Sequence, residues 1–252
     1  MSVVSYEVRD AVATLTLNRP HTRNALNAEL RGAIRDGFAS FASDESARVL
    51  VLAAEGETFC AGGDLTEMAA LGTAVIPRNF VPAITEFTEC HKPVIAAVQG
   101  PALGGGFWLV QNCDLVVAAD DARFGITEAK WGRGAPWSTP LFSLIGARHA
   151  LELMVTAEPI DAYRAREMGL VNHVVPVAEL AVRAQALAHR IATLAPLSIR
   201  TSVQMVRAHR AQVAGDLADT AWTMWEPVYE SADAQEGPRA FTEKRPPRWQ
   251  GK

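Results

Sequence analysis

The amino-acid sequence predicts an α/β fold with largely parallel strands, and two observations support this. Apolar runs at 48–54, 92–100 and 114–119 have the composition of buried strands, and segments with helical patterns separate them. From about Ser138 onward the patterns are helical only. A chain of 252 residues, 49% of them hydrophobic, can bury a full core, either as one large domain or as a domain with an appendage.

The first elements are predicted to be a hairpin and a helix. Segments 5–9 and 12–18 alternate apolar with other residues on either side of Asp10-Ala11, which is the pattern of two paired strands. Residues 27–41 then repeat apolar side chains at helical spacing, and the run at 48–54 follows as the next strand.

The middle of the chain repeats one order of elements, in which an apolar strand leads through a glycine loop into a helix. A helix begins behind Asp64, another is predicted over roughly 78–90, and a third follows the glycines at 104–106. Five helical patterns then fill the C-terminal part, at 138–155, 161–169, 177–194, 196–213 and 216–231.

Composition and charge exclude several classes of function. The net charge of −4 argues against a nucleic-acid binder that relies on a broad basic surface. Cys60, Cys90 and Cys113 lie far apart without a CxxC pair, which argues against a disulfide framework and suits a reducing compartment. Neither these cysteines nor the histidines show metal-ligand spacing, so no metal site is predicted.

No targeting or membrane segment is expected. The first residues show neither a basic region nor a long apolar stretch of the kind that signal peptides carry. Residues 93–110 are long and apolar enough to span a membrane, but Gln99-Gly100-Pro101 and the three glycines would break such a helix. We therefore expect no membrane insertion and a cytoplasmic location.

Two glycine loops carry the strongest functional signal, "FCAGGDL" at 59–65 and "PALGGGF" at 101–107. Each joins a strand to a helix, and sites in parallel α/β sheets form where the chain leaves such strands. Glycine lets a ligand approach backbone N–H groups, so two converging loops could form an oxyanion hole. Tight turns and close packing are the alternative. The sequence contains neither GxxxxGK[ST] nor GxSxG, which argues against a P-loop and an α/β-hydrolase elbow.

These loops also belong to a wider pattern. Together with "NRPHTRNALN", "CDLVVAADDARFGITEAKWG" and "FTEKRPP", they resemble the crotonase (enoyl-CoA hydratase/isomerase) superfamily over essentially the whole chain. The resemblance implies an α/β spiral of ββα units with a helical C-terminal trimerisation region, usually assembled as trimers or hexamers. It divides the chain into a core at 1–195 that binds acyl-CoA and an oligomerisation region at 196–252.

The resemblance also implies a chemistry. Members bind acyl-CoA thioesters and stabilise an enolate at the thioester oxygen with two peptide N–H groups, which fall on Gly63 and Gly105. Coenzyme A enters as part of the substrate, so no separate cofactor is expected. The positions that match the family's CoA-binding segments are Arg23, Ala25, Ala61, Asp64, Leu65 and Lys244.

One of the two family glutamates is missing. Hydratases of the superfamily use two, and the matching positions here are Trp108 and Glu128. Single-glutamate 3,2-enoyl-CoA isomerases also keep only the later one, and "EAKWGRGAPW" fits the stretch that follows it in them. Glu128 would then move a proton between two carbons, within an apolar wall formed by Trp108, Trp131 and Trp137 that would raise its pKa.

Three functions remain open: an isomerase that uses Glu128 alone, a hydratase or lyase with an unidentified second group, and an acyl-CoA-binding protein without chemistry. The isomerase is favoured. Glu67 is a spare carboxylate near the first glycine loop, although a role on the helix surface is the simpler interpretation. Glu128 could likewise be no more than the first residue of a helix that begins after Thr127. Trp108 could be an ordinary core residue.

Overall fold

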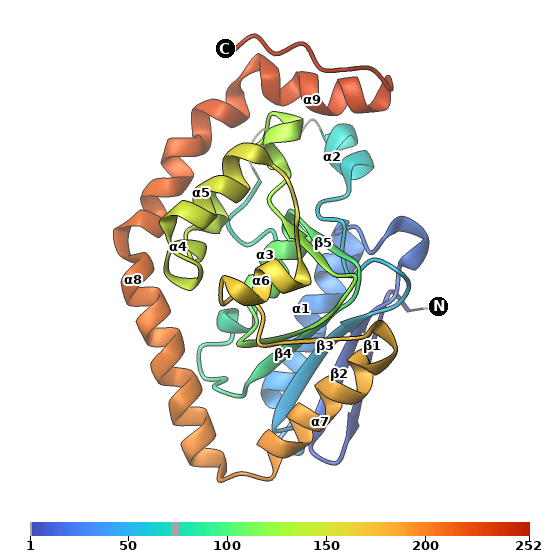
Figure 1. The fold of residues 1–252 in the computed structure, drawn as a ribbon, viewed down its shortest axis with the longest axis vertical. Helices are drawn as coiled ribbons and strands as arrows, with labels where there is room; N and C mark the ends of the chain where they lie inside the picture. Colours follow the sequence, from blue (N-terminus) through green and yellow to red (C-terminus); the bar gives the residue numbers. More distant parts are fainter. Residues whose placement is uncertain (1, 72–75) are drawn as a thin grey trace.

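The computed structural model describes residues 2–71 and 76–252, which form two sheets wrapped by helices (Figure 1). The larger sheet has the order β1-β2-β3-β4-β6-β9, in which β1 and β2 are antiparallel and all later neighbours are parallel. The smaller sheet pairs β5 with β7 and β8. The strands are β1 (Val4–Arg9), β2 (Val12–Leu17), β3 (Val49–Ala54), β4 (Val94–Val98), β5 (Pro101–Leu103), β6 (Leu115–Ala119), β7 (Arg123–Gly125), β8 (Ile160–Asp161) and β9 (His173–Val175).

The predicted hairpin is confirmed. Arg9 pairs with Val12, so Asp10 and Ala11 form a two-residue turn. Both have positive φ, 49° and 63°, as a type I′ hairpin turn requires.

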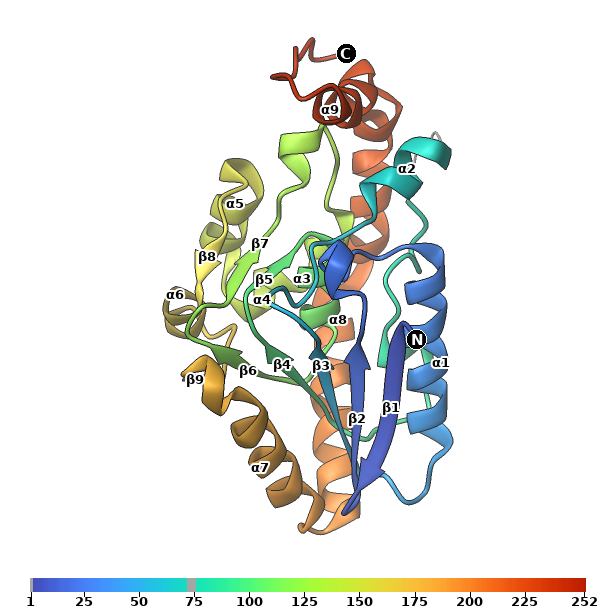
Figure 2. The same cartoon turned by 90° about the vertical axis from the view of Figure 1, so that its right-hand side faces the viewer.

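Two helices cover opposite faces of the larger sheet (Figure 2). Helix α1 (Ala28–Ser43) packs on the face to which Leu50 and Leu52 point, whereas α7 (Leu180–Ala192) packs on the face of Val49 and Val51. Alternate residues of β3 therefore enter two separate cores, which explains why this strand is apolar throughout.

The prediction of a helix over roughly 78–90 was wrong. The structure has only a 3₁₀ turn there, η2 (Ile84–Glu86). Pro82 has no N–H to donate and favours an extended conformation in the residue before it, and Ala83 is itself extended at φ −137° and ψ 144°. Phe80, Val81 and Ile84 are nevertheless buried, so the apolar pattern reflects an irregular segment packed on the core.

The C-terminal part is mostly helical, as predicted, but the expectation of helices alone from Ser138 onward was wrong. The short strands β8 and β9 lie there, and β9 pairs with β6 in the larger sheet. Helix α8 (Pro196–Glu230) runs along one whole side of the molecule and is interrupted at Gly215, and α9 (Ala232–Thr242) folds back across one end (Figure 1). The remaining helices are α2 (Leu65–Leu71), α3 (Gly105–Gln111), α4 (Leu141–Leu144), α5 (Ala147–Thr156) and α6 (Ala162–Glu167), with 3₁₀ turns η1 (Pro20–Thr22), η3 (Glu128–Trp131), η4 (Pro136–Ser138) and η5 (Val177–Glu179).

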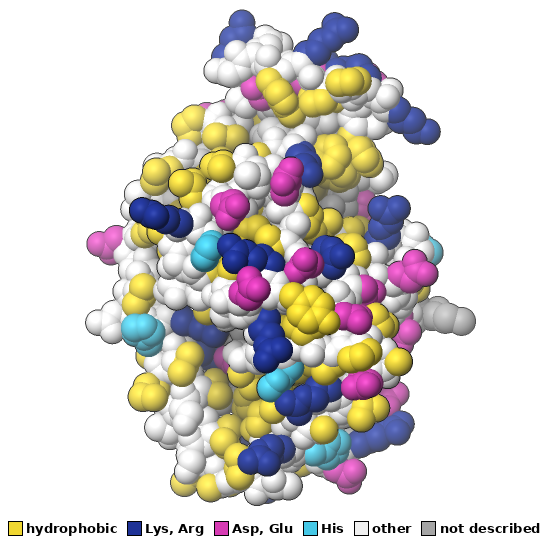
Figure 3. All heavy atoms as spheres, viewed as in Figure 1, with side chains coloured by type: hydrophobic (Ala, Val, Ile, Leu, Met, Phe, Trp, Pro, Cys, Tyr) yellow, Lys and Arg dark blue, Asp and Glu magenta, His cyan; other side chains and the backbone are white. Residues whose placement is uncertain are grey.

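Two general properties of the surface and helices follow. Lysine and arginine side chains are interspersed with aspartate and glutamate over the face seen in Figure 3, without a broad basic patch on that face. Within residues 2–71 and 76–252, no helix combines the length and apolar character needed to cross a membrane.

Candidate active site

The two glycine loops lie against each other. Cys60 N donates to Pro101 O at 3.1 Å and Leu103 N donates to Cys60 O at 3.0 Å, so the loops are paired immediately before their glycines. A Cβ placed on Gly105 would lie only 3.6 Å from Gly63 N. Neither the Gly63 N–H nor the Gly105 N–H donates a hydrogen bond to another described residue. Gly105 is the first residue of α3, where an N–H has no partner within the helix.

Each of the three consecutive glycines has a different structural role. Gly104 has φ +52°, and a Cβ there would lie 3.0 Å from Glu128 Oε1. Gly105 presents its N–H, as described above. A Cβ on Gly106 would overlap the carbonyl oxygen of Cys60. The triplet therefore permits the close approach of a carboxyl group on one side and of the neighbouring loop on the other.

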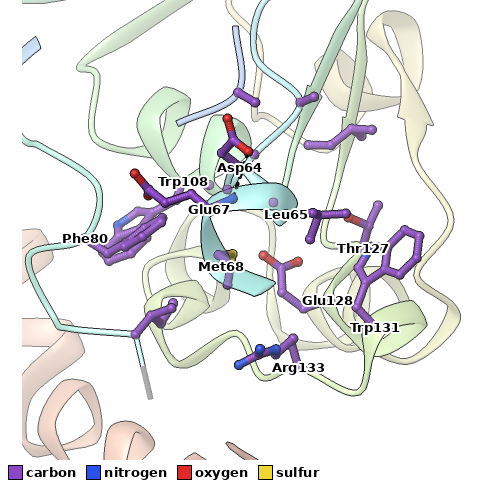
Figure 4. A pocket seen from close by; sticks show the side chains of 18 of the residues that line it. Asp64, Leu65, Glu67, Met68, Phe80, Trp108, Thr127, Glu128, Trp131 and Arg133 are labelled. Atoms are coloured by element: carbon purple, nitrogen blue, oxygen red, sulfur yellow. Dashed lines mark hydrogen bonds between the residues drawn. The ribbon is translucent and has the colours of Figure 1, made fainter. Parts of the chain in front are cut away.

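The loops open into a pocket of about 950 Å³ (Figure 4). The structure brings nearly all of the predicted site residues into its lining: Arg23, Ala25, Ala61, Gly63, Asp64, Leu65, Gly105, Trp108, Glu128 and Trp137. Lys244 does not line the pocket among the described residues; it follows α9 and is exposed. In a single chain, Lys244 is thus not placed with the other predicted binding residues.

The smaller sheet places Glu128 in the pocket. The parallel pairing of β5 with β7 matches Leu103 with Gly125, so the segments that follow these strands run beside each other. Glu128 opens η3, and Thr127 makes no side-chain cap there. Its Oε2 is buried without a hydrogen-bond partner among the described residues. Removal of the carboxyl from water raises the pKa of Glu128 to about 8, so Glu128 is a pocket residue rather than a surface cap.

Trp108 occupies an aromatic wall of the same pocket. Its ring stacks on that of Trp137 with centroids 5.6 Å apart and planes 5° apart, and Trp222 of α8 lies 6.2 Å away at a tilt. Trp108 lines the pocket and also packs in the main core, so the two interpretations of this residue both hold. An indole at this position has no group that could exchange a proton with substrate.

Glu67 and Asp64 have structural partners. Glu67 accepts hydrogen bonds from Ala28 N at 2.7 Å and from Arg31 Nη1 at 2.8 Å, which ties α2 to the start of α1. Asp64 caps α2 by accepting from Thr66 N at 3.1 Å and Glu67 N at 3.2 Å. Both carboxylates line the pocket, but both are engaged in these hydrogen bonds.

The C-terminal helices complete the pocket, and the sequence did not indicate how. Tyr229 of α8 is buried, lines the pocket and donates from its hydroxyl to Gly134 O at 2.9 Å. Burial raises the pKa of this hydroxyl, so it remains protonated. Phe241 of α9 meets Trp131 edge-to-face at 5.0 Å. The available sequence signal was the spacing of Trp222, Trp225 and Tyr229, which places three aromatic rings along one side of a helix.

Arg133 is one of several further lining residues that the sequence patterns did not indicate. It is 8% exposed and lies between Trp131 and Gly134 in the pocket wall. Burial lowers the pKa of its guanidinium. Among the described residues, no group of three or more histidine, cysteine, aspartate or glutamate side chains is placed to hold a metal ion.

Known proteins resemble this chain over its whole length. The family model "Enoyl-CoA hydratase/isomerase" matches residues 7–252. The enoyl-CoA hydratase EchA19 of Mycobacterium tuberculosis is 34% identical over 98% of this chain and 96% of its own length. A carnitinyl-CoA hydratase from Mycobacterium avium superposes with a TM-score of 0.87 at 33% identity, covering 100% of both chains. A methylmalonyl-CoA decarboxylase superposes with a TM-score of 0.88 at 29% identity, covering 99% of both. The chain belongs to the enoyl-CoA hydratase/isomerase family, the crotonase superfamily.

Proposed function

We propose that this chain is an enoyl-CoA isomerase that moves a double bond within an acyl-CoA thioester and uses Glu128 as its only proton carrier. The observation that carries the proposal is the contrast between two positions in one pocket. Glu128 presents a buried carboxyl group with a pKa raised to about 8, whereas Trp108 presents an indole stacked on Trp137.

The reaction needs one base and one site for negative charge. The carboxylate of Glu128 removes a proton from C2 of a 3-enoyl thioester, and the electron pair of that C–H bond moves into the thioester carbonyl. The enolate oxygen accepts hydrogen bonds from the N–H groups of Gly63 and Gly105, each worth about 3–4 kcal/mol of transition-state stabilisation. Glu128 then returns the proton to C4, and the product is the 2-enoyl thioester.

The pocket walls support this assignment. Trp108, Trp137 and Phe80 give the pocket that holds this carboxyl an apolar lining, and we expect the lining to exclude water from the reacting carbons. Exclusion of water favours return of the proton over addition of water to the double bond.

Hydration is the second candidate, because several relatives are named enoyl-CoA hydratases. In that reaction Glu128 would act with a group that we have not identified, since Glu67 and Asp64 are engaged elsewhere. Binding of acyl-CoA without chemistry is the third candidate, and the buried, unpartnered Oε2 of Glu128 argues against it, because such a group costs stability without another purpose.

We also propose that the chain assembles as a trimer or hexamer, acts in the cytoplasm and needs no cofactor besides its CoA thioester. Support for assembly comes from the apolar side chains that α8 exposes, which are Leu197, Met205, Val213, Leu217 and Met224. Sedimentation of the purified chain measures its oligomeric state directly.

The function is tested by incubating the wild type and Glu128→Gln with a 3-enoyl-CoA and, separately, with a 2-enoyl-CoA in heavy-oxygen water. We expect double-bond migration without label in the wild type, and its loss in the variant. A labelled 3-hydroxyacyl-CoA from the wild type would contradict the isomerase and support the hydratase. If neither thioester reacts but both bind, the protein is a binding protein.

A further inference from the structure

The direction of the Glu128 side chain depends on a short backbone turn. Glu128 begins η3, and its Oε2 is buried without a hydrogen-bond partner among the described residues. Arg133 N donates to Glu128 O at 2.9 Å and Lys130 N donates to Thr127 O at 3.0 Å, so the segment closes on itself. Figure 4 shows Glu128, Trp131 and Arg133 on this turn, with the carboxyl group pointing toward α2. Because Oε2 is not held by such a bond, the carboxyl keeps its direction only if the turn itself is fixed.

Both C-terminal helices pack closely against this turn. A Cβ on Gly132 would overlap the carbonyl oxygen of Asp233 in α9, and a Cβ on Gly134 would overlap the ring of Trp225 in α8. Contacts this close limit where the turn can lie. Packing of this kind is not directional, however, so it does not by itself fix how the peptide groups are rotated.

Tyr229 of α8 adds a directional contact. It is 1% exposed, lines the same pocket as Glu128, and donates from its hydroxyl to Gly134 O at 2.9 Å. Gly134 is itself buried, so its carbonyl oxygen would lose this partner at a place shielded from water if the hydroxyl were absent. The hydroxyl also lies within electrostatic range of Glu128, so the two side chains are near each other in the pocket. A phenylalanine ring would fill the same space, and the hydroxyl therefore serves something other than packing.

We propose that Tyr229 is a positioning residue for Glu128, because its hydrogen bond to Gly134 O fixes the turn that points the carboxyl group at the substrate. Tyr229 does not itself exchange a proton with the substrate, since its proton is bonded to Gly134 O. Helix α8 thereby acts on the reacting group through one hydrogen bond. The expected effect on the rate rests on the proposed function, whereas the expected effect on the carboxyl group of Glu128 does not.

The Tyr229→Phe variant tests the effect on the rate. It removes one oxygen atom and keeps the ring, so the chain should fold with a Tm about 2–4 °C lower. Burial raises the pKa of the Tyr229 hydroxyl, so the hydroxyl is neutral and its removal takes away no charge. We expect kcat with a 3-enoyl-CoA to fall at least about 10-fold, because a misplacement of about 1 Å can cost about 100-fold in rate. KM should stay within about twofold, because the contacts with acyl-CoA are kept.

The Tyr6→Phe variant is the matched control. Tyr6 of β1 also donates its hydroxyl to a partner, Asp44 Oδ2 at 3.3 Å, but it does not line the pocket among the described residues. This variant loses a tyrosine hydrogen bond elsewhere in the fold. It should keep both kcat and KM close to those of the wild type.

Infrared spectroscopy measures the state of Glu128 without any substrate. Subtracting the spectrum of Glu128→Gln, made in each background, isolates the band of the protonated carboxyl group. The loss of this band between pH 5.5 and 10 gives the pKa of Glu128, which we expect to be about 8 in the wild type and in Tyr6→Phe. In Tyr229→Phe the carboxyl is no longer held away from water, so its pKa should fall toward the ordinary value for glutamate. A loss of stability alone would not move this pKa.

Two results overturn the proposal while leaving the proposed function intact. One is a Tyr229→Phe variant with kcat within about twofold of the wild type and the same pKa of Glu128. The other is a higher KM with unchanged kcat and pKa, which would mean that the hydroxyl acts on the binding of acyl-CoA instead. If the wild type does not isomerise a 3-enoyl-CoA, the proposed function fails, and the pKa of Glu128 in the two backgrounds alone decides whether Tyr229 positions it.

Discussion

The carboxyl group of Glu128 lies directly against Gly104: a Cβ on that glycine would be 3.0 Å from Oε1 of the glutamate. The two residues come from segments that β5 and β7 place side by side, and Gly104 is also the residue before α3. One position thus controls the direction in which the proton carrier points and the start of the helix that presents the Gly105 N–H.

Gly104→Ala should therefore abolish most of the activity. The new methyl group displaces the Glu128 carboxyl, and a misplacement of about 1 Å can cost about 100-fold in rate. The backbone at φ 52° and ψ −121° adds about 1–3 kcal/mol of strain. We expect kcat/KM to fall by about 100-fold or more, measured with a 3-enoyl-CoA, together with a lower Tm.

Gly215→Ala is the matched control for that variant. Gly215 has nearly the same backbone angles, φ 44° and ψ −143°, but a Cβ there would meet no atom within 4 Å. This substitution should lower Tm by a similar amount and leave kcat/KM close to that of the wild type. Equal losses of activity in the two variants would show that strain, rather than contact with Glu128, is responsible.

The rate should depend on the ionisation of Glu128. A base must be deprotonated to accept a proton, and burial raises the pKa of this carboxyl to about 8. We expect kcat/KM to rise with pH, about tenfold per pH unit below 8, and to level off above it. The measurement is a profile from pH 5.5 to 9.5 with a fixed 3-enoyl-CoA. A profile that is flat between pH 6 and 9 would rule out Glu128 as a base with this pKa.

Much of this architecture can be predicted from the sequence because it depends on local patterns. The hairpin follows from alternation around Asp10-Ala11, and the two glycine loops follow from glycines between an apolar run and a helix. The position of Glu128 was predicted by resemblance, and the pairing of β5 with β7 provides its physical basis. Those two strands have only three residues each, too few to be recognised by alternation.

The contribution of the C-terminal helices could not be predicted because it depends on contacts between distant segments. Tyr229 meets Gly134 across 95 positions of the chain. Helix α9 contains Gly237 and Pro238, both poor helix formers. Its Gly237 packs against the backbone of Trp131, a contact between segments that are distant in the sequence. The division at residue 195 remains a prediction, although α8 and α9 also line the pocket.

The same carboxyl group should make the protein less stable at high pH. The folded-state pKa of about 8 lies above the unfolded value of 4.5, so between these values the folded chain holds a proton that the unfolded chain has released. The free energy of unfolding therefore falls as pH rises from 4.5 through 8. The Glu128→Gln variant has no carboxyl group at this position, so it lacks this pH-dependent loss of stability.

We therefore expect Glu128→Gln to gain stability relative to the wild type as pH rises. The two Tm values should be close at pH 4.5 and differ by at least about 2–4 °C at pH 8.5, which corresponds to about 1 kcal/mol. Glu158→Gln, at an exposed position, should show no such divergence. A Tm difference that is the same at both pH values would mean that Glu128 is not destabilised by burial in the folded chain.

The Trp108→Glu variant tests whether the missing second carboxylate determines which reaction the pocket catalyses. The substitution breaks the stack with Trp137 and places a carboxyl group on the aromatic wall, so it should destabilise the fold by about 3 kcal/mol or more. A second carboxylate in the same pocket as Glu128 can also hold a water molecule and activate it. We expect the labelled 3-hydroxyacyl-CoA formed from a 2-enoyl-CoA in heavy-oxygen water to rise at least about tenfold above the wild type.

Trp108→Gln separates the carboxylate from the space that the substitution opens. Glutamine has nearly the same size as glutamate and also removes the indole, but it cannot accept a proton from water at neutral pH. Hydration in the glutamate variant alone would show that the loss of one carboxylate separates an isomerase from a hydratase in this pocket. If both variants hydrate equally, Trp108 instead acts by keeping water out, and Glu128 alone suffices to activate a water molecule once one can enter.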